Sequence, residues 1–293
     1  MNITSHIKNL LPGAKNVLNK SIDDKIRKVR EQIWIPYPKA NLVLKELEDF
    51  YSYPKKERMP NLLIVGDTNN GKSTILNKFY NKYQPYTKIK NYWPIIKFSA
   101  PLSPSENSLY EKILDELRVP YNSNSSATSK EYQVLNILKN IETKLIIIDE
   151  FQDIFHGDVR QQRKFLTALK HLGNNLQIPI VAAGVWEVQS VLSSDPQISN
   201  RFETIVKLEK WNPDINFAKL IASFEQNLPF REASYLYKGE AFKLLYTLSE
   251  GYIGELNRVI EKAAIHAIRN NKKFIDINTL KSINFTPPSL RRR

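Results

Sequence analysis

Residues 66–73 carry residue types suited to binding phosphate. They read Gly66-Asp67-Thr68-Asn69-Asn70-Gly71-Lys72-Ser73, with two glycines enclosing four residues and followed by lysine and serine. Glycines let the backbone curl so that its N–H groups converge on phosphate oxygens at a helix N-terminus. We expect Lys72 to reach the β- and γ-phosphates and the Ser73 hydroxyl to hold Mg²⁺. The pattern predicts a site for a nucleoside triphosphate that extends to Thr74.

Two acids later in the chain supply the remaining chemistry of such a site. Asp149-Glu150 directly follow the apolar run 145–148. We expect Asp149 to hold Mg²⁺, directly or through water, and Glu150 to deprotonate the water that attacks the γ-phosphate. The alternative is that two acids simply end a strand. With the loop upstream, the pair predicts a hydrolase.

Charge on the departing phosphoryl group also requires a cation. Arg201, in the run 199–203, is the best candidate because it lies between the last two expected strands. From there an arginine could project into a neighbouring subunit's site. The sequence leaves open a surface arginine that pairs with Glu203.

The elements that would position these residues alternate between strand and helix. Apolar runs predict strands at 62–65, 93–98, 145–148, 178–183 and 204–208, and helical periodicity falls at 39–51, 74–83, 109–117, 131–141 and 159–172. This alternation predicts an α/β fold, a doubly wound parallel sheet whose ligand lies at the carboxyl ends of the strands.

The two ends of the chain have a different character. Residues 1–34 are predicted to be an N-terminal helical extension, and residues 35–211 the α/β domain. Residues 212–285 contain helical patterns only, at 214–227, 240–249, 253–271 and 277–283. The basic tail 286–293 is expected to be disordered.

Composition narrows the function further. The 293 residues have a net charge of +13, which favours a polyanionic partner such as nucleic acid, although a merely basic surface is the alternative. The absence of cysteine excludes disulfides, thiolate zinc sites and a thiol nucleophile. We find no run long enough to span a bilayer and no apolar leader within 1–20, so we expect a cytoplasmic protein without a membrane partner.

The stretch that surrounds the loop is similar to a known signature. Arg58-Met59-Pro60-Asn61, the strand 62–65 and the loop together resemble the TniB family of transposition ATPases. These are relatives of TnsC, the AAA+ regulator of Tn7-like transposons, including CRISPR-associated ones. The similarity extends to 35–38, 145–150, Arg201-Phe202 and 250–256.

The resemblance implies a P-loop AAA+ ATPase domain with a C-terminal α-helical lid. ATP-bound subunits would assemble head to tail into a ring or helical filament on duplex DNA. The assembly would link a TniQ-type targeting protein to a DDE transposase of the TnsB/TniA kind, and ATP hydrolysis would control its disassembly. Arg201 matches the family's arginine finger. Pro36 and Tyr37 match residues that line the adenine pocket, with a packing role left open.

Two departures from the family pattern predict slow hydrolysis. The strand 178–183 is followed by Gly184-Val185, where a polar sensor residue is usual. The lid has Gly254 or Glu255 where many relatives have arginine, and Arg258 or Lys262 are the candidates to substitute for it.

For DNA, the family uses loops that face the axis of the assembly. The matching loops, 99–108 and 121–130, offer Ser103, Tyr121 and Lys130, and the next helix offers Arg160, Arg163 and Lys164. Each of these could instead be plain solvated surface. Binding is expected to be largely independent of sequence and sensitive to salt.

Two other functions remain open. One is an AAA+ helicase or replication-initiator loader of the IstB or DnaC kind, which a fold-level motif cannot separate from a transposition regulator. The other is a binding module with a structural nucleotide, and the presence of Glu150 argues against it.

Overall fold

The structure is a computed structural model that describes residues 3–83, 92–193 and 199–291. The chain forms two compact units. The sheet unit consists of residues 38–68 and 72–209. The helical unit consists of residues 1–37, 69–71 and 210–293, so the N-terminal helices and the middle of the phosphate-binding pattern group with the C-terminal helices.

The sheet unit contains a parallel five-stranded sheet with the order β2-β3-β4-β1-β5. Each of the five expected strands is present. Their bounds are β1 Leu62–Gly66, β2 Ile95–Ser99, β3 Leu145–Asp149, β4 Ile180–Gly184 and β5 Thr204–Leu208. Because β4 separates β1 from β3, the loop after β1 and the acids after β3 flank the carboxyl end of β4.

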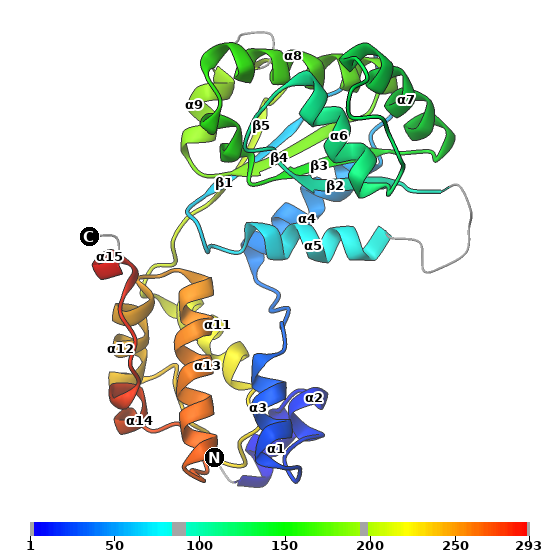
Figure 1. Cartoon of the computed structure of the whole chain (residues 1–293). Helices are drawn as coiled ribbons and strands as arrows, with labels where there is room; N and C mark the ends of the chain where they lie inside the picture. Colours follow the sequence, from blue (N-terminus) through cyan, green and yellow to red (C-terminus); the bar gives the residue numbers. More distant parts are fainter. Residues whose placement is uncertain (1–2, 84–91, 194–198, 292–293) are drawn as a thin grey trace. The chain divides into compact units, whose positions relative to one another are not determined.

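Helices cover both faces of this sheet, which gives the predicted α/β architecture (Figure 1). Alternate strand residues such as Val65 and Ile148 pack into a core with the helices on one face. That face carries α6 Glu106–Glu116, α7 Ala127–Asn140, α8 Val159–Leu176 and α9 Glu187–Ser193, while the other carries α4 Pro38–Tyr51 and α5 Lys72–Tyr83.

Capping residues explain why two helices begin earlier than their apolar periodicity predicted. The Ser105 side chain accepts from the Ser108 N–H, and Ser126 accepts from the Ser129 N–H. These bonds satisfy backbone donors that a first helical turn leaves without partners. The helices therefore start at Glu106 and Ala127 rather than at 109 and 131.

The main apolar core of the helical unit surrounds its longest helix, α13, and a smaller cluster of Leu10, Ala14 and Leu18 lies in the N-terminal segment. Ile26 of the N-terminal segment and Ile35 belong to that core. The helices are α1 Ile3–Asn9, α2 Pro12–Lys15, α3 Ile22–Arg30, α11 Ile215–Glu225, α12 Gly239–Ser249, α13 Ile253–Arg269, α14 Ile277–Ser282 and α15 Pro288–Arg291.

The tail that we expected to be disordered instead ends in the short helix α15. The Ser289 N–H donates to the Glu250 carboxylate at 3.1 Å, and the Arg291 guanidinium pairs with Glu255. The Pro- and Arg-rich composition of this segment had suggested disorder. In the structure, two carboxylates bind it. Arg292 and Arg293 lie outside the described residues.

Across the described part of the chain, no helix is both long enough and apolar enough to cross a lipid bilayer.

Candidate functional site

The phosphate-binding pattern follows β1 and leads into α5, as the sequence predicts. Gly66 lies against β5, where an added Cβ would come within 2.4 Å of the Leu208 carbonyl oxygen. Gly71 has φ +89°, a conformation that L side chains rarely adopt. Both glycines are therefore required by the backbone path.

Lys72 is buried at the start of α5, with 7% of its surface exposed. Its ammonium donates to the carbonyl oxygens of Gly66 at 2.8 Å and Asp67 at 2.9 Å. Burial lowers the pKa of Lys72, while the nearby acids Glu150, Asp149 and Asp67 act in the opposite direction. The ammonium is thus held by two neutral carbonyls that phosphate oxygens could replace.

Asp149 ends β3 as a buried carboxylate. Its Oδ1 accepts the Glu150 N–H at 3.0 Å, and its Oδ2 lies 4.0 Å from the Lys97 ammonium. Within the described ranges, no group of three or more His, Cys, Asp or Glu side chains could hold a metal. A hydroxyl at Ser73 and one carboxylate fit Mg²⁺, which typically keeps water and binds nucleotide phosphates.

Glu150 leaves the strand in a left-handed conformation, with φ 50° and ψ 42°. Its carboxylate accepts a hydrogen bond from the side-chain amide of Gln152. The carbonyl oxygen of the same amide accepts the Val185 N–H at 3.3 Å. Gln152 was not among the site residues predicted from the sequence. The one available signal was the absence of a polar side chain at Gly184-Val185.

Arg201 has no carboxylate partner in the portion of the chain that the structure describes, so the alternative of a pair with Glu203 is not observed. Partial burial lowers its pKa, and the like charge of Arg58 adds to that effect. Arg201 and Lys170 both line a small cavity in the sheet unit. A guanidinium among cations is well suited to meet an anion.

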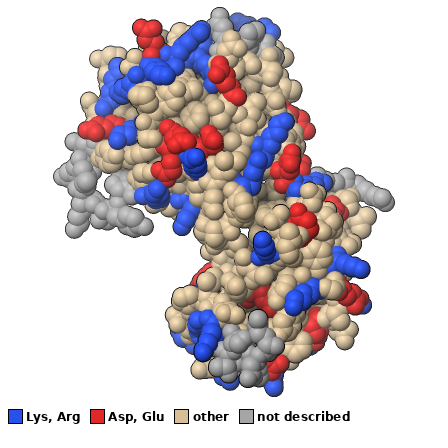
Figure 2. Space-filling view, turned by 180° about the vertical axis from the view of Figure 1, so that it is seen from behind, with Lys and Arg blue, Asp and Glu red and all other residues tan. Residues whose placement is uncertain are grey.

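Basic residues lie along the exposed side of α8. Arg160, Arg163 and Lys164 are all exposed, and their spacing places them on one side of the helix. None has an ion pair with a described acid. Figure 2 shows basic side chains gathered in a band on one face of the protein. We call these three residues the α8 basic stripe.

Ser103 is exposed in a loop that lies beside the start of α8. Its neighbour Pro104 packs so closely on Gly157 that an added Cβ there would come within 2.4 Å of the proline ring. The fold therefore brings the Ser103 loop to the N-terminal end of the α8 basic stripe.

Lys130 and Tyr121 are used inside the sheet unit. Lys130 is 1% exposed, its ammonium pairs with Glu111 at 2.6 Å, and it donates to the Ser123 carbonyl at 2.9 Å. The same ammonium lies 5.7 Å from the centre of the Tyr121 ring. These contacts give the cation a role in folding, and it is not on the surface that DNA could reach.

In the helical unit, Tyr37 packs edge-on against Trp211 with ring centroids 5.1 Å apart. Its hydroxyl oxygen is 3.5 Å from the position that a Cβ on Gly71 would occupy. Burial raises the pKa of Tyr37 to about 12, so the phenol is neutral at pH 7. Pro36 is exposed beside it. Tyr37 thus lies next to the loop glycine, while a packing role with Trp211 is also present.

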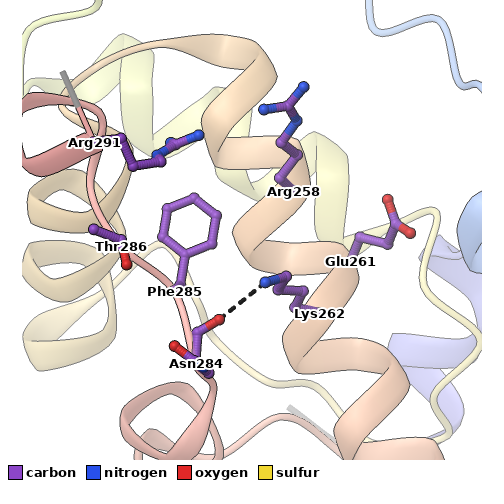
Figure 3. Close-up of a pocket in the computed structure, with 7 residues that line it drawn as sticks. All are labelled: Arg258, Glu261, Lys262, Asn284, Phe285, Thr286 and Arg291. Atoms are coloured by element: carbon purple, nitrogen blue, oxygen red, sulfur yellow. Dashed lines mark hydrogen bonds between the residues drawn. The ribbon is translucent and has the colours of Figure 1, made fainter.

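Arg258 lines a cavity of about 440 Å³ within the helical unit (Figure 3). Lys262 and Arg291 contribute two more cations, and both lie over the Phe285 ring. Lys262 donates to the Asn284 carbonyl at 2.9 Å, and Arg258 pairs with Glu255 at 3.3 Å. Because these cations already have partners, the cavity alone does not identify a ligand.

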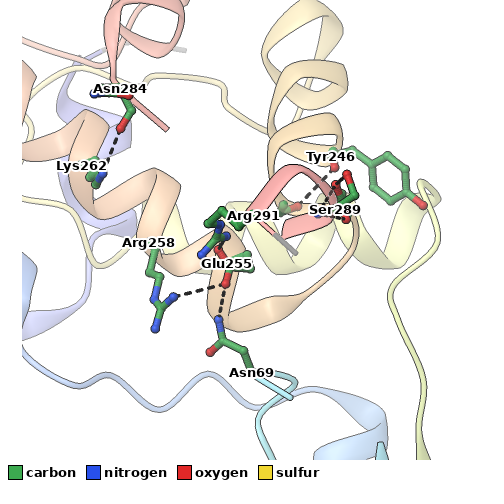
Figure 4. A network of polar contacts seen from close by, with 10 residues as sticks. Asn69, Tyr246, Glu255, Arg258, Lys262, Asn284, Ser289 and Arg291 are labelled. Carbon is green, nitrogen blue, oxygen red and sulfur yellow. Dashed lines mark hydrogen bonds and ion pairs between the residues drawn. The ribbon is translucent and has the colours of Figure 1, made fainter. Parts of the chain in front are cut away.

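Glu255 joins the middle of the phosphate-binding pattern to α13 (Figure 4). Its buried carboxylate accepts from the Asn69 side-chain amide at 2.7 Å and also pairs with Arg258 and Arg291. The Gly254 N–H donates to the Asn69 carbonyl at 3.0 Å. Gly254 and Glu255 therefore both contact the loop residue Asn69 directly.

The sequence matches the family described as bacterial TniB protein over residues 25–213. This chain belongs to the TniB family. No curated relative matches it.

Several solved structures share the fold of this TniB-family chain. Cdc6p from Pyrobaculum aerophilum is 14% identical with a TM-score of 0.63, over 84% of this chain and 67% of that one. ORC2 from Aeropyrum pernix, with ADPNP and ADP, is 13% identical with a TM-score of 0.63, over 87% and 70%. ORC1 from the same organism, in complex with DNA, is 12% identical with a TM-score of 0.57, over 88% and 68%. The fold is therefore that of the P-loop AAA+ ATPases, as predicted.

Proposed function

We propose that this TniB-family chain is an Mg²⁺-dependent ATPase that assembles on duplex DNA and regulates transposition. The most direct support is the gathering of Lys72, Asp149 and Glu150 at the carboxyl edge of the sheet. Family membership favours transposition over a replication-type loader.

Binding of ATP would use groups already close to position. Phosphate oxygens replace the carbonyls that now hold Lys72, and the backbone N–H groups of residues 66–74 surround them. Ser73 and Asp149 would hold Mg²⁺, which when bound would neutralise part of the phosphate charge. By family resemblance, Pro36 and Tyr37 would line the adenine pocket.

Hydrolysis would then depend on Glu150. Its carboxylate accepts a proton from a water molecule as the water oxygen bonds to the γ-phosphorus. The bond from that phosphorus to the β,γ-bridging oxygen breaks, and ADP and phosphate are released. Arg201 of an adjacent subunit stabilises the charge of the phosphoryl group in transit.

We expect this turnover to be slow. Val185 offers no polar side chain to the nucleotide, and Arg258 is engaged with Glu255. Slow hydrolysis suits a regulator whose ATP-bound assembly must persist long enough to recruit partners. By family resemblance, these partners are a DDE transposase and a TniQ-type targeting protein.

Duplex DNA would contact the α8 basic stripe and the Ser103 loop. Three exposed cations that form no ion pair with a described acid are suited to phosphate oxygens, which carry no sequence information. Binding should therefore be largely independent of DNA sequence.

Replacement of Glu150 by Gln tests the catalytic part of this proposal. The variant keeps the size of the side chain but cannot accept the proton, so we expect phosphate release to fall at least about 100-fold. Nucleotide binding and assembly on DNA should remain. Phosphate release is measured with duplex DNA present, and Glu142→Gln, an exposed acid before β3, is the matched control.

A wild-type rate in Glu150→Gln would remove Glu150 from catalysis. No release from the wild-type chain, with nucleotide bound, would instead favour the structural-nucleotide alternative.

A further inference from the structure

The turn after β3 presents a side-chain amide to two separate elements. The Gln152 Nε2 group donates to the Glu150 carboxylate, and its Oε1 atom accepts the Val185 N–H at 3.3 Å. One end of the amide thus binds the acid after β3, and the other binds the backbone directly after β4. β3 and β4 are paired neighbours, with Ile148 opposite Ala182.

The local backbone makes room for this bridge. An added Cβ on Gly184 would lie 2.9 Å from Gln152 Oε1 and 2.6 Å from a Val188 methyl carbon. Any larger residue at 184 would therefore displace the amide, the Val188 side chain or both. A glycine at the end of β4 is what this contact requires.

The segment that carries Gln152 is firmly anchored. Phe151 and Ile154, on either side of it in the short 3-10 helix Phe151–His156, are each 0% exposed. The Gln152 amide therefore extends from a turn that two buried neighbours hold in place.

Glu150 needs such a partner. Its backbone is left-handed, so the regular geometry of the strand does not set the direction of its carboxylate. A general base must hold its carboxylate within hydrogen-bond reach of the attacking water. In the part of the chain that the structure describes, the Gln152 amide donates a hydrogen bond to the Glu150 carboxylate.

We propose that Gln152 is a positioning residue that orients Glu150 for hydrolysis and couples it to the end of β4. It takes the place of the polar residue that the chain lacks at Gly184-Val185. This inference rests on the proposed ATPase function. A purely structural contact would act through the stability of the turn. The proposed contact acts instead through the orientation of the Glu150 carboxylate.

The test uses Gln152→Met, which keeps the length and volume of the side chain but removes both hydrogen bonds. We expect kcat for phosphate release to fall at least about tenfold, while the Kd of a slowly hydrolysed ATP analogue stays within about twofold. Gly184→Ala, which crowds the amide from the other side, should lower kcat in the same way. Gln133→Met on α7, whose amide bonds only the Pro120 carbonyl among the described residues, should leave both quantities unchanged.

A double variant separates this inference from the function on which it rests. If Gln152 acts through Glu150, Gln152→Met should cause no further loss in a Glu150→Gln background. A wild-type kcat in Gln152→Met, a multiplicative loss in the double variant, or an equal loss of nucleotide affinity would each overturn the positioning role while leaving Glu150 as the base. A wild-type chain that binds ATP and releases no phosphate would overturn both proposals.

Discussion

Glu150 occupies a backbone conformation that costs a non-glycine residue about 1–2 kcal/mol. Such strain persists where the surroundings fix it. Here the Glu150 N–H is held by Asp149 Oδ1 at 3.0 Å, and the next residue, Phe151, is fully buried. The strained turn is what brings the Gln152 amide back onto the carboxylate two residues before it.

Gly254 offers a test of the contact between α13 and Asn69. An added Cβ would lie 2.0 Å from the Asn69 Oδ1 atom and 2.7 Å from its carbonyl oxygen. We expect Gly254→Ala to displace Asn69 from Glu255 and to weaken binding of a fluorescent ATP analogue by about tenfold or more, a cost in the range of overpacking. Gly13→Ala is the control, because its Cβ would meet only the flexible end of Lys28.

An unchanged Kd in Gly254→Ala would show that the Asn69 contact has no influence on nucleotide binding.

The sequence allowed the reactive residues to be named but not their supporting contacts. Lys72 and Ser73 follow the glycines at the spacing that phosphate binding requires, and the acid pair directly follows an apolar run. Gln152 shows no such spacing, since its importance depends on β4 lying next to β3. Lysine is usually a surface residue. The Lys130 ammonium is nevertheless bound inside the fold by Glu111, nineteen positions earlier.

At the scale of elements, strands were easier to place than helix ends. Runs such as 145–148 are buried on both faces, so their apolar character alone marks them. The predicted end of the helix at 172 was too early, and α8 continues to Leu176. Gly173 lies within α8 and lets the helix approach β4, because an added Cβ there would be 3.3 Å from the Ile180 side chain.

The cap of α14 gives the helical unit a pH-dependent contribution. Asp276 accepts from the Lys272 ammonium at 2.9 Å and from the Thr279 N–H at 2.7 Å, and these bonds lower its pKa from 3.8 to about 2. The ionised form therefore stabilises the fold. Its contribution is complete above pH 3.8 and is lost as the pH falls towards about 2.

We expect Asp276→Asn to lower the Tm at pH 7, and the difference from wild type to disappear as the pH is lowered through this window. Asp276→Ala, which also removes the cap, should lower the unfolding free energy by about 1 kcal/mol. Asp49→Asn, an exposed acid on α4, serves as the control in thermal unfolding followed by circular dichroism. A difference that is constant with pH would contradict the charge-based explanation.

At the scale of the molecule, the net charge of +13 predicted a polyanionic partner without locating it. The α8 basic stripe is the place that we propose, since it is exposed and lacks acid partners among the described residues, whereas Lys130 is buried in the fold. The signature 58–73 led to the family, and the match over residues 25–213 confirms it. Neither composition nor periodicity could have separated Lys130 from the stripe cations, because its burial and its pair with Glu111, nineteen positions earlier, arise only in the fold.

Our proposed function requires that ATP binding drives assembly of this chain on duplex DNA. Electron microscopy of the full chain with duplex DNA and a slowly hydrolysed ATP analogue tests it most directly. Samples without nucleotide and the Lys72→Ala variant are the controls for the nucleotide. The variant with Arg160, Arg163 and Lys164 changed to Ala is the control for the DNA surface.

We predict rings or filaments only when both the analogue and DNA are present. Affinity should fall by about 10³ or more between 50 and 200 mM salt if six or more phosphates are contacted, and less steeply without the α8 basic stripe. A chain that stays monomeric, or that binds DNA equally well with and without nucleotide, would contradict the account.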